Sequence, residues 1–266
     1  MHKLETRRLS MTFTRGDRSI EVLRDVTLGI GAGEFVSIVG ASGCGKTTFL
    51  RTVDGLITPT SGSILIDGQA VTGPSSNRAF VFQRDSLFPW RSTLKNTLFG
   101  PEVRGDDMRA ARPLALKMLD LVTLGGFEKY YPHEMSGGMR QRVNLARALT
   151  FTPEVLLMDE PFASLDAQTR EIMQSELLRI WQESRKTVLF VTHQIDEAVF
   201  LSDRVLVFTV RPGRLKKVVE IDLPRPRDLA IKRTPEFVGY VDRIWRLIEE
   251  EVRQSVRPEQ TRDVHA

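Results

Sequence analysis

The stretch GASGCGKTT at residues 40–48 constrains the fold of this chain more than any other, because it places three glycines and a lysine directly after an apolar run. That run, EFVSIV, has the pattern of a buried strand, and KTTFLRTVDGL has the pattern of a helix. Gly40, Gly45, Lys46 and Thr47 fit G-x-x-x-x-G-K-[ST] in the strand–loop–helix context that this motif requires. The backbone N–H groups of such a loop and the positive end of the helix would wrap a triphosphate.

Each residue type in this loop has a predicted task. Lys46 is expected to reach the β- and γ-phosphates as a point charge, Thr47 to offer its hydroxyl oxygen to Mg²⁺, and Thr48 to close the anion shell. The other predicted nucleotide-binding positions of the loop are Gly40, Ser42, Gly43, Cys44 and Gly45. The alternative interpretation is a glycine-rich turn that caps a helix beside an incidental lysine.

Five further runs are short, apolar and rich in β-branched residues, which predicts strands. They are SILID (63–67), AFVFQ (79–83), EVLLMDE (154–160), TVLFVTH (187–193) and RVLVFTV (204–210). Helical patterns lie between the later runs, including 167–184, where Met173, Leu177, Ile180 and Trp181 share one face. Strands buried on both faces and joined by helices predict an α/β fold with a mostly parallel sheet. The segment 90–134 is more helical and is interpreted as a lobe inserted between strands.

Two acidic side chains end the apolar run VLLMDEP. Asp159 and Glu160 would lie at the C-terminal edge of the sheet, where open α/β sheets bind their ligands. Asp159 is expected to hold Mg²⁺, directly or through water, and Glu160 to polarise an attacking water. Without a phosphate loop, the same pair would be an ordinary solvated strand end.

A second anion-binding turn occurs in MSGGMRQR, residues 135–142. Ser136, Gly137 and Gly138 stand at the start of a predicted helix and offer a hydroxyl and two glycine backbones. A nucleotide wrapped by residues 40–48 has little phosphate left for a second grip on the same side. The turn is therefore predicted to serve the nucleotide of another copy, so that two chains enclose two ATP molecules around a two-fold axis. Alone, SGG is more often just a helix cap.

These motifs together resemble those of the ATP-binding subunits of ABC transporters, over nearly all of residues 5–225. They stand in the family's order: the loop 40–48, Gln83 in AFVFQ, the signature 135–139, LLMDE with Glu160, SLD at 164–166 and His193 ending LFVTH. The resemblance implies a P-loop NTPase ABC-ATPase fold with an antiparallel β subdomain and an α-helical subdomain inserted at about 88–150. It implies a cassette over residues 1–225 and a short helical tail over 226–266.

The same resemblance assigns roles to three further residues. It makes Gln83 a sensor of Mg²⁺ and the attacking water, Asp166 part of the dimer contact, and His193 a contact to the γ-phosphate. By itself, His193 would more often be a satisfied histidine at a strand end. ATP and Mg²⁺ are the implied ligands, and the implied enzyme is an ATPase coupled to transport.

The sequence departs from the family pattern at three positions. Phe13 is the best match to the aromatic, commonly tyrosine, that stacks on adenine, and a phenyl face can stack. The loop after Phe13 is several residues longer than usual, and the alternative is a core position. Met135 and Met139 replace the signature's leucine and glutamine; Met135 keeps apolar bulk, but Met139 cannot make the amide hydrogen bonds of glutamine.

Two further segments carry apolar side chains that are expected to pack against another surface. In 85–100, Leu87, Phe88 and Trp90 flank a proline and are placed to line a groove for a helix of a membrane subunit, the alternative being buried core. Within the tail, residues 235–252 are predicted to pack on their own domain through one helical face. That face carries Phe237, Val241, Ile244 and Ile248.

LFPWRS, the methionine in SGGM and RPGRLKKVVEIDLPRPRD resemble the subgroup that serves nitrate, sulfonate and taurine uptake. This implies an importer of a small anionic solute, working with a second copy of itself, transmembrane permease subunits and a solute-binding protein. No stretch approaches the roughly 18 apolar residues that span a bilayer. With one cysteine and an N-terminus unlike a signal peptide, the chain is expected to be peripheral, on the cytoplasmic side of the inner membrane.

Two other functions fit less of the sequence. The 38 Lys and Arg against 34 Asp and Glu give a net charge of only +4, and nucleic acid is not an expected partner. An ABC-type ATPase acting on DNA or ribosomes would show paired cassettes, a long coiled-coil insertion or a basic face. A P-loop kinase or GTPase would explain residues 40–48 and Asp159 but leave MSGGMRQR and LFVTH without a task.

Overall fold

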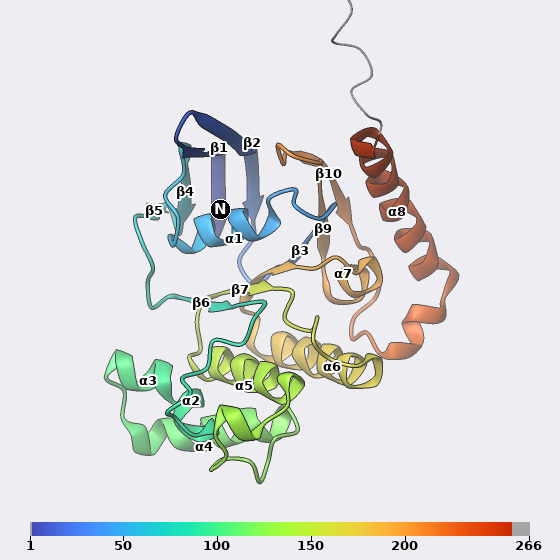
Figure 1. The fold of residues 1–266 in the computed structure, drawn as a ribbon. Helices are drawn as coiled ribbons and strands as arrows, with labels where there is room; N and C mark the ends of the chain where they lie inside the picture. Colours follow the sequence, from blue (N-terminus) through green and yellow to red (C-terminus); the bar gives the residue numbers. More distant parts are fainter. Residues whose placement is uncertain (1, 257–266) are drawn as a thin grey trace, which may run out of the picture.

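The computed structural model describes residues 2–256, which form two sheets surrounded by helices (Figure 1). The central sheet has six strands, in the order β10 (Leu215–Glu220), β9 (Arg204–Phe208), β3 (Phe35–Val39), β8 (Thr187–Val191), β7 (Val155–Asp159) and β6 (Arg78–Val81). All neighbouring pairs are parallel except β9 and β10. Every residue of β3, β7 and β8 is buried, as expected for strands covered on both faces. The predicted α/β fold with a mostly parallel core sheet is confirmed.

Successive residues of the central strands contribute to two different cores. Val36 and Ile38 of β3 pack on one side with Phe49 of α1 (Lys46–Asp54), whereas Phe35 and Val39 face the opposite side. This alternation follows from the two-residue period of a strand. It places α1 against one face of the sheet, directly after β3, so the loop between them opens at the sheet's C-terminal edge.

The second sheet is antiparallel and covers the side of α1 away from the central sheet (Figure 1). Its order is β2 (Arg18–Ile30), β1 (Leu4–Arg15), β4 (Ser61–Ile66) and β5 (Gln69–Ala70). The predicted strand SILID therefore belongs to this sheet as β4. The expected long loop after Phe13 does not form, because β1 and β2 pair up to Arg15 and Arg18 and leave only two residues in the turn. The residues assigned to that loop extend the two strands instead.

A helical lobe follows β6 in the chain (Figure 1). It contains α2 (Thr93–Thr97), α3 (Phe99–Arg104), α4 (Met108–Leu121), the 3-10 helix η1 (Pro132–Glu134) and α5 (Gly137–Thr150). Gly105 ends α3 with a φ of 81°, and the Asp107 carboxylate caps α4 by accepting the Arg109 N–H. Helix α5 contacts α2, α3 and α4 and also β6, so it connects the lobe to the central sheet.

Helices α6 (Ala167–Ser184) and α7 (Ile195–Leu201) belong to the core on the sheet's other face. On α6, Met173, Leu177 and Trp181 are buried on the predicted apolar face, while Ile180 is half-buried. The indole edge of Trp181 meets the ring of Phe35 at 5.8 Å between centroids. The helix is therefore fixed to the first strand of the core by its largest side chain.

The C-terminal part of the described chain packs on its own domain, as predicted. After η2 (Leu229–Arg233), helix α8 (Pro235–Val256) packs beside α7 and β9 at one side of the molecule (Figure 1). Phe237 and Ile244 are buried, and Val241 and Ile248 pack against the same core. The predicted tail also includes residues 257–266, which lie outside the described residues.

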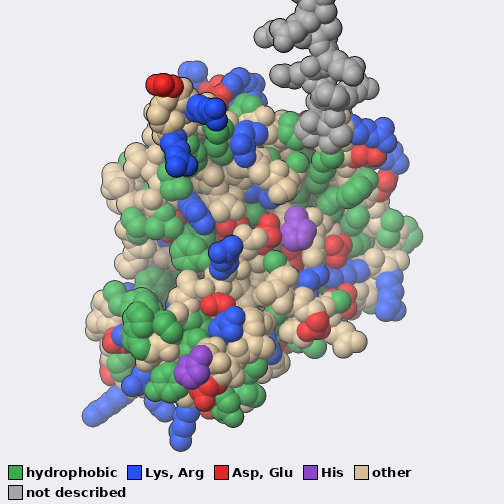
Figure 2. Space-filling model, in the orientation of Figure 1, with side chains coloured by type: hydrophobic (Ala, Val, Ile, Leu, Met, Phe, Trp, Pro, Cys, Tyr) green, Lys and Arg blue, Asp and Glu red, His purple; other side chains and the backbone are tan. Residues whose placement is uncertain are grey.

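Charged side chains of both signs are interspersed on the face shown in Figure 2, without a large single-sign patch. This agrees with the near balance of charge in the sequence. In the part of the chain that the structure covers, no helix combines the length and apolar character needed to cross a bilayer.

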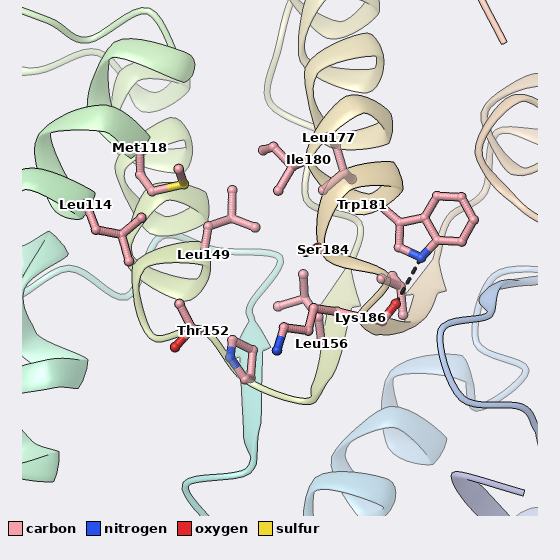
Figure 3. Close-up of a pocket in the computed structure, with 12 residues that line it drawn as sticks. Leu114, Met118, Leu149, Thr152, Leu156, Leu177, Ile180, Trp181, Ser184 and Lys186 are labelled. Atoms are coloured by element: carbon pink, nitrogen blue, oxygen red, sulfur yellow. Dashed lines mark hydrogen bonds between the residues drawn. The ribbon is translucent and has the colours of Figure 1, made fainter. Parts of the chain in front are cut away.

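An apolar cavity of about 150 Å³ lies where the lobe meets the core (Figure 3). Leu114 and Met118 enter it from α4, and Leu177 and Trp181 from α6. The Trp181 indole N–H donates to the Lys186 carbonyl at 2.9 Å, which closes one end of it. Since the cavity separates α4 from α6, the lobe's main attachment to the core is through α5.

Candidate nucleotide-binding site

The loop between β3 and α1 curls around its own lysine. The ammonium of Lys46 donates to the carbonyl oxygens of Gly40 at 2.8 Å and Ala41 at 3.0 Å, and only 7% of the residue is exposed. Gly45, the residue before α1, has a φ of 104°, and a Cβ there would lie 2.8 Å from the Leu23 side chain. Only glycine combines that backbone conformation with so little space. The loop is thus fixed with a cation at its centre, beside the N-terminus of α1.

A cavity of about 590 Å³ opens in front of this loop, a size typical of ligand sites. Its lining combines the phosphate loop with one residue from β2 and one from each of the loops that follow β6, β7, β8 and β9. These are Val22, Ser42, Gly43, Gly45, Lys46, Thr47, Thr48, Gln83, Glu160, His193 and Arg211. Most of the predicted loop residues therefore face one cavity, together with the three predicted catalytic side chains.

Cys44 is the loop residue that points away from this cavity. It is 1% exposed and packs in the core between the two sheets. Burial raises the pKa of its thiol above the ordinary value. Any contact of residue 44 with a phosphate would therefore be made by its backbone.

Asp159 is a buried carboxylate that forms no ion pair among the described residues. It ends β7, is 1% exposed, and accepts a hydrogen bond from the Thr47 hydroxyl at 3.0 Å. Burial raises its pKa, while the Thr47 hydrogen bond opposes that shift and neighbouring Glu160 adds to it.

The oxygens of Thr47 and Asp159 suit Mg²⁺. No group of three His, Cys, Asp or Glu in the described chain could hold a metal ion by itself. Mg²⁺ commonly takes one or two protein oxygens and completes its shell with phosphate and water, so the residues present fit it.

Three predicted catalytic side chains meet at one carboxylate oxygen. Oε2 of Glu160 accepts a hydrogen bond from Nε2 of Gln83 at 3.0 Å and lies 3.2 Å from Nδ1 of His193. The three residues follow β6, β7 and β8, which are neighbours in the sheet. Glu160 has a φ of 48°, and its N–H donates to the Val191 carbonyl at 2.9 Å. The turn after β7 is thus held by β8 in a left-handed conformation that is uncommon for a side chain of this size.

A buried acid that sequence reasoning missed supports the segment around His193. Glu197 on α7 is 3% exposed, and its carboxylate accepts hydrogen bonds from Gln174 at 2.9 Å and from the Thr192 hydroxyl. Thr192 in turn accepts the Gln194 N–H at 3.0 Å, so both neighbours of His193 are tied to this network. The sequence signal was an acid within the apolar stretch IDEAVFL.

The predicted signature turn lies elsewhere on the surface. Ser136 caps α5 by accepting the Met139 N–H at 3.3 Å; Ser136 and Gly137 are exposed, and Gly138 is half-buried. None of the three lines the cavity at the phosphate loop. Met139 packs against the core instead of facing outward, which gives this departure from the family pattern a structural role.

Asp166 and Phe13 are also exposed and outside the cavity lining. Asp166 caps α6, and the Thr169 N–H, which it accepts at 2.9 Å, holds the pKa of its carboxyl below the usual range. Phe13 is 44% exposed on β1, so the alternative of a core position is wrong. Its strand neighbour across the hairpin is Ile20, two residues before Val22 at the cavity's edge.

An aromatic groove of about 430 Å³ lies at the junction of β6 and the lobe. Phe88 lines it, half-buried, and its ring lies 5.5 Å from that of Trp90, which is 72% exposed. Leu87, by contrast, packs against the core. The alternative that all three are buried core is therefore wrong, but of the three only Phe88 lines the groove.

A loop wrapped around a lysine, next to a buried carboxylate that accepts only the Thr47 hydroxyl, suits a nucleoside triphosphate. The fold and the site together define the class of P-loop nucleotide-binding proteins. The family model described as ABC transporter matches residues 23–163. The chain belongs to the ABC transporter family, in which it is an ATP-binding subunit, an ATPase coupled to transport.

Relatives and a solved structure agree with this assignment. The chain is 46% identical to the nitrate import ATP-binding protein NrtD of Synechocystis over 93% of this chain and 95% of the relative. It is 44% identical to the taurine import ATP-binding protein TauB of Roseobacter denitrificans, over 89% and 90% of the two chains. A dimeric structure of the ATP-binding cassette MJ0796 bound to ADP and Pi superposes with a TM-score of 0.75, at 31% identity, covering 83% of this chain and all of that one.

Proposed function

We propose that this chain is the ATP-hydrolysing subunit of an importer for a small anionic solute of the nitrate, sulfonate or taurine kind. The relatives named for nitrate and taurine import support the solute class, since each matches nearly the whole chain. The proposed assembly contains two copies of this chain, transmembrane permease subunits and a solute-binding protein. The chain would then be peripheral, on the cytoplasmic side of the inner membrane.

The observation that carries the mechanism is the separation of the two anion-binding turns. The loop at Lys46 lines the cavity, whereas the turn at Ser136 is exposed and outside it. A two-fold dimer in which the Ser136 turn of each chain covers the phosphates held by the other would complete both sites. The dimeric structure of the similar cassette supports this arrangement.

Within such a site, the chain's own groups have distinct tasks. Lys46 exchanges the Gly40 and Ala41 carbonyls for phosphate oxygens, while the amides of the loop and of α1 bind the rest of the polyphosphate. Glu160 accepts a proton from the attacking water, and Gln83 and His193 orient the Glu160 carboxylate through the contacts at Oε2. Mg²⁺ held near Thr47 and Asp159 would neutralise phosphate charge. The same arrangement leaves His193 facing the γ-phosphate, and Phe13 beside the adenine.

Binding and hydrolysis would then control the distance between the two chains. Shifting a pair of chains from mostly open to mostly closed needs about 5.5 kcal/mol of differential binding. Two nucleotides, each held by both chains, are a suitable source of that difference. We propose that the aromatic groove around Phe88 receives a helix of the permease and transmits the motion.

The test is the substitution Glu160→Gln, studied by size exclusion and by phosphate release. Since the amide cannot accept the proton but leaves the binding groups in place, we expect a stable dimer at saturating Mg-ATP and almost no hydrolysis. Glu171→Gln, at an exposed position of α6, is the matched control and should behave as wild type. A Glu160→Gln protein that stays monomeric with Mg-ATP would contradict the mechanism.

A further inference from the structure

The tip of the β9–β10 hairpin is docked on the phosphate loop. The Gly213 N–H donates to the Val22 carbonyl at 2.8 Å, and the Gly213 carbonyl accepts the Arg24 N–H at 3.0 Å. A Cβ at Gly213 would overlap the carbonyl oxygen of Cys44, so the two backbones are in direct contact. The hairpin tip is therefore positioned by backbone contacts on both β2 and the loop.

This docking brings the guanidinium of Arg211 to the cavity. Its Nη2 and Nε donate to the Gly43 carbonyl at 3.1 and 3.3 Å, and Arg211 lines the same cavity as Lys46 and Thr47. Arg211 thus binds one loop carbonyl from outside, while Lys46 binds two from inside. Two cations therefore hold the loop's carbonyl oxygens, which leaves the loop better suited to anions.

Arg211 differs from Arg204 and Arg225 in having no carboxylate partner among the described residues. Arg204 pairs with Glu34 at 3.0 Å and Arg225 with Asp203 at 2.8 Å. Within residues 2–256, no carboxylate forms an ion pair with Arg211. A guanidinium has five N–H donors, and Arg211 uses one from Nη2 and one from Nε, both on the Gly43 carbonyl oxygen. The remaining donors stay available at the cavity.

The position of Arg211 is fixed from the opposite side by α8. The carboxylate of Glu251 accepts the Val210 N–H at 3.1 Å and pairs with Lys216 of β10 at 2.8 Å. Glu251 is 7% exposed, so this anchor is buried. The backbone before Arg211 is thus held in place, and the hydrogen bonds to Gly43 hold the guanidinium beside the loop before a ligand binds.

We propose that Arg211 is a second cation of the nucleotide site, which binds the polyphosphate of ATP alongside Lys46. This inference rests on the proposed function, because it takes the cavity to be the ATP site. A guanidinium that forms charge-assisted hydrogen bonds to phosphate contributes enough to change the affinity about tenfold. The contribution grows with the charge of the nucleotide, so it is larger for ATP than for ADP.

The experiment compares the affinities of the full chain for ATP and ADP by calorimetry, in Arg211→Met, Arg211→Lys and Arg214→Met. Arg214 is an exposed arginine of the same hairpin that does not line the cavity, so Arg214→Met is the matched control. We expect Arg211→Met to bind ATP about tenfold more weakly, with a smaller loss for ADP, and Arg211→Lys to recover part of the affinity. Arg214→Met should match wild type.

The possible outcomes separate the inference from the function on which it depends. Wild-type affinity in Arg211→Met, or an equal loss for ATP and ADP that Arg211→Lys does not repair, overturns the inference in favour of a purely structural contact to Gly43. If the wild-type chain itself fails to bind ATP, the proposed function is wrong. If the difference in ATP affinity between Arg211→Met and wild type diminishes with added salt, the inference is supported, because salt screens a charge contact at an open cavity.

Discussion

Helices α1 and α5 both begin at glycine-containing turns, but their surroundings differ. The turn before α1 encloses Lys46, which is 7% exposed, and opens into a cavity that also contains Glu160. The turn before α5 is exposed and is capped only by its own Ser136 hydroxyl. The α1 turn therefore has a complete set of groups for a phosphate chain, and the α5 turn does not. This difference is what the proposed two-chain site would account for, since the exposed turn of one chain would cover the phosphates held by the other.

The largest expected effect comes from a substitution in the turn before α5. In Ser136→Arg, we expect turnover to fall about 100-fold or more, because a donor group is lost and a bulky cation blocks the approach of the second chain. The affinity of the separated chain for ATP should stay within about twofold, since Ser136 is outside its cavity. Phosphate release and calorimetry measure the two quantities.

The control for Ser136→Arg is Ala110→Arg, which adds the same charge at an exposed position of α4 in the same lobe. Its turnover should equal that of wild type. If Ser136→Arg hydrolyses ATP at the normal rate, the signature turn is not part of the active site.

A mixing experiment sharpens the comparison further. Lys46→Ala should bind ATP poorly and Ser136→Arg should not turn it over, so each is inactive alone. In a mixed dimer, the intact Lys46 loop of the Ser136→Arg chain meets the intact Ser136 turn of the Lys46→Ala chain, which restores one of the two sites. In an equal mixture, about a quarter of all sites are restored in this way. Turnover should therefore reappear on mixing. A mixture as inactive as its components would show that each site is built within one chain.

A smaller effect, on the free energy of unfolding, is expected at Asp159, which contacts Thr47 of α1. Asp159→Asn removes a carboxylate whose pKa is raised by burial, so the nucleotide-free variant should be about 1 kcal/mol more stable in urea at neutral pH. Because the folded pKa exceeds the unfolded one, the Asp159 contribution to stability falls as pH rises between those values. The difference in free energy of unfolding between Asp159→Asn and wild type should shrink at acidic pH. It should grow to a constant value above the folded-state pKa of Asp159. The variant should also lose the Mg²⁺-dependent part of ATP binding.

The smallest effect on the isolated chain is expected at Trp90, whose ring contacts that of Phe88 beside the aromatic groove. Trp90 is 72% exposed, so Trp90→Ala should change the free energy of unfolding by less than about 0.5 kcal/mol. ATP hydrolysis by the isolated subunit should be unaffected. In the assembled transporter, the same variant should uncouple hydrolysis from transport, and full transport activity would argue against the groove as the permease contact.

Local patterns predicted the central strands and the phosphate loop well, for a physical reason. An apolar run buried on both faces, or a glycine loop between a strand and a helix, carries its signal within about ten residues. The end of β6 was harder to predict: the run AFVFQ suggested a strand to Gln83, but β6 ends at Val81. Gln83 leaves the sheet, which allows it to reach Glu160.

The parts of the site that were missed depend on contacts between distant segments. Arg211 contacts Gly43 across 168 residues of sequence, and this contact exists only because β9 is the neighbour of β3 in the sheet. Glu197 is similar, since its partner Gln174 comes from α6. Neither strand order nor helix packing is encoded in a short sequence window. Phe13 was predicted only as an aromatic followed by a long loop, and the hairpin that holds it is formed by strand pairing that the local sequence did not indicate.

The burial of Cys44 has a practical consequence for following this protein in solution. It is the chain's single cysteine, it is 1% exposed, and its thiol has a raised pKa, so it will react slowly with maleimides at neutral pH. A cysteine introduced on the surface can therefore be labelled selectively without first replacing Cys44. Spin or fluorescent labels on two copies would then report their separation during each catalytic cycle.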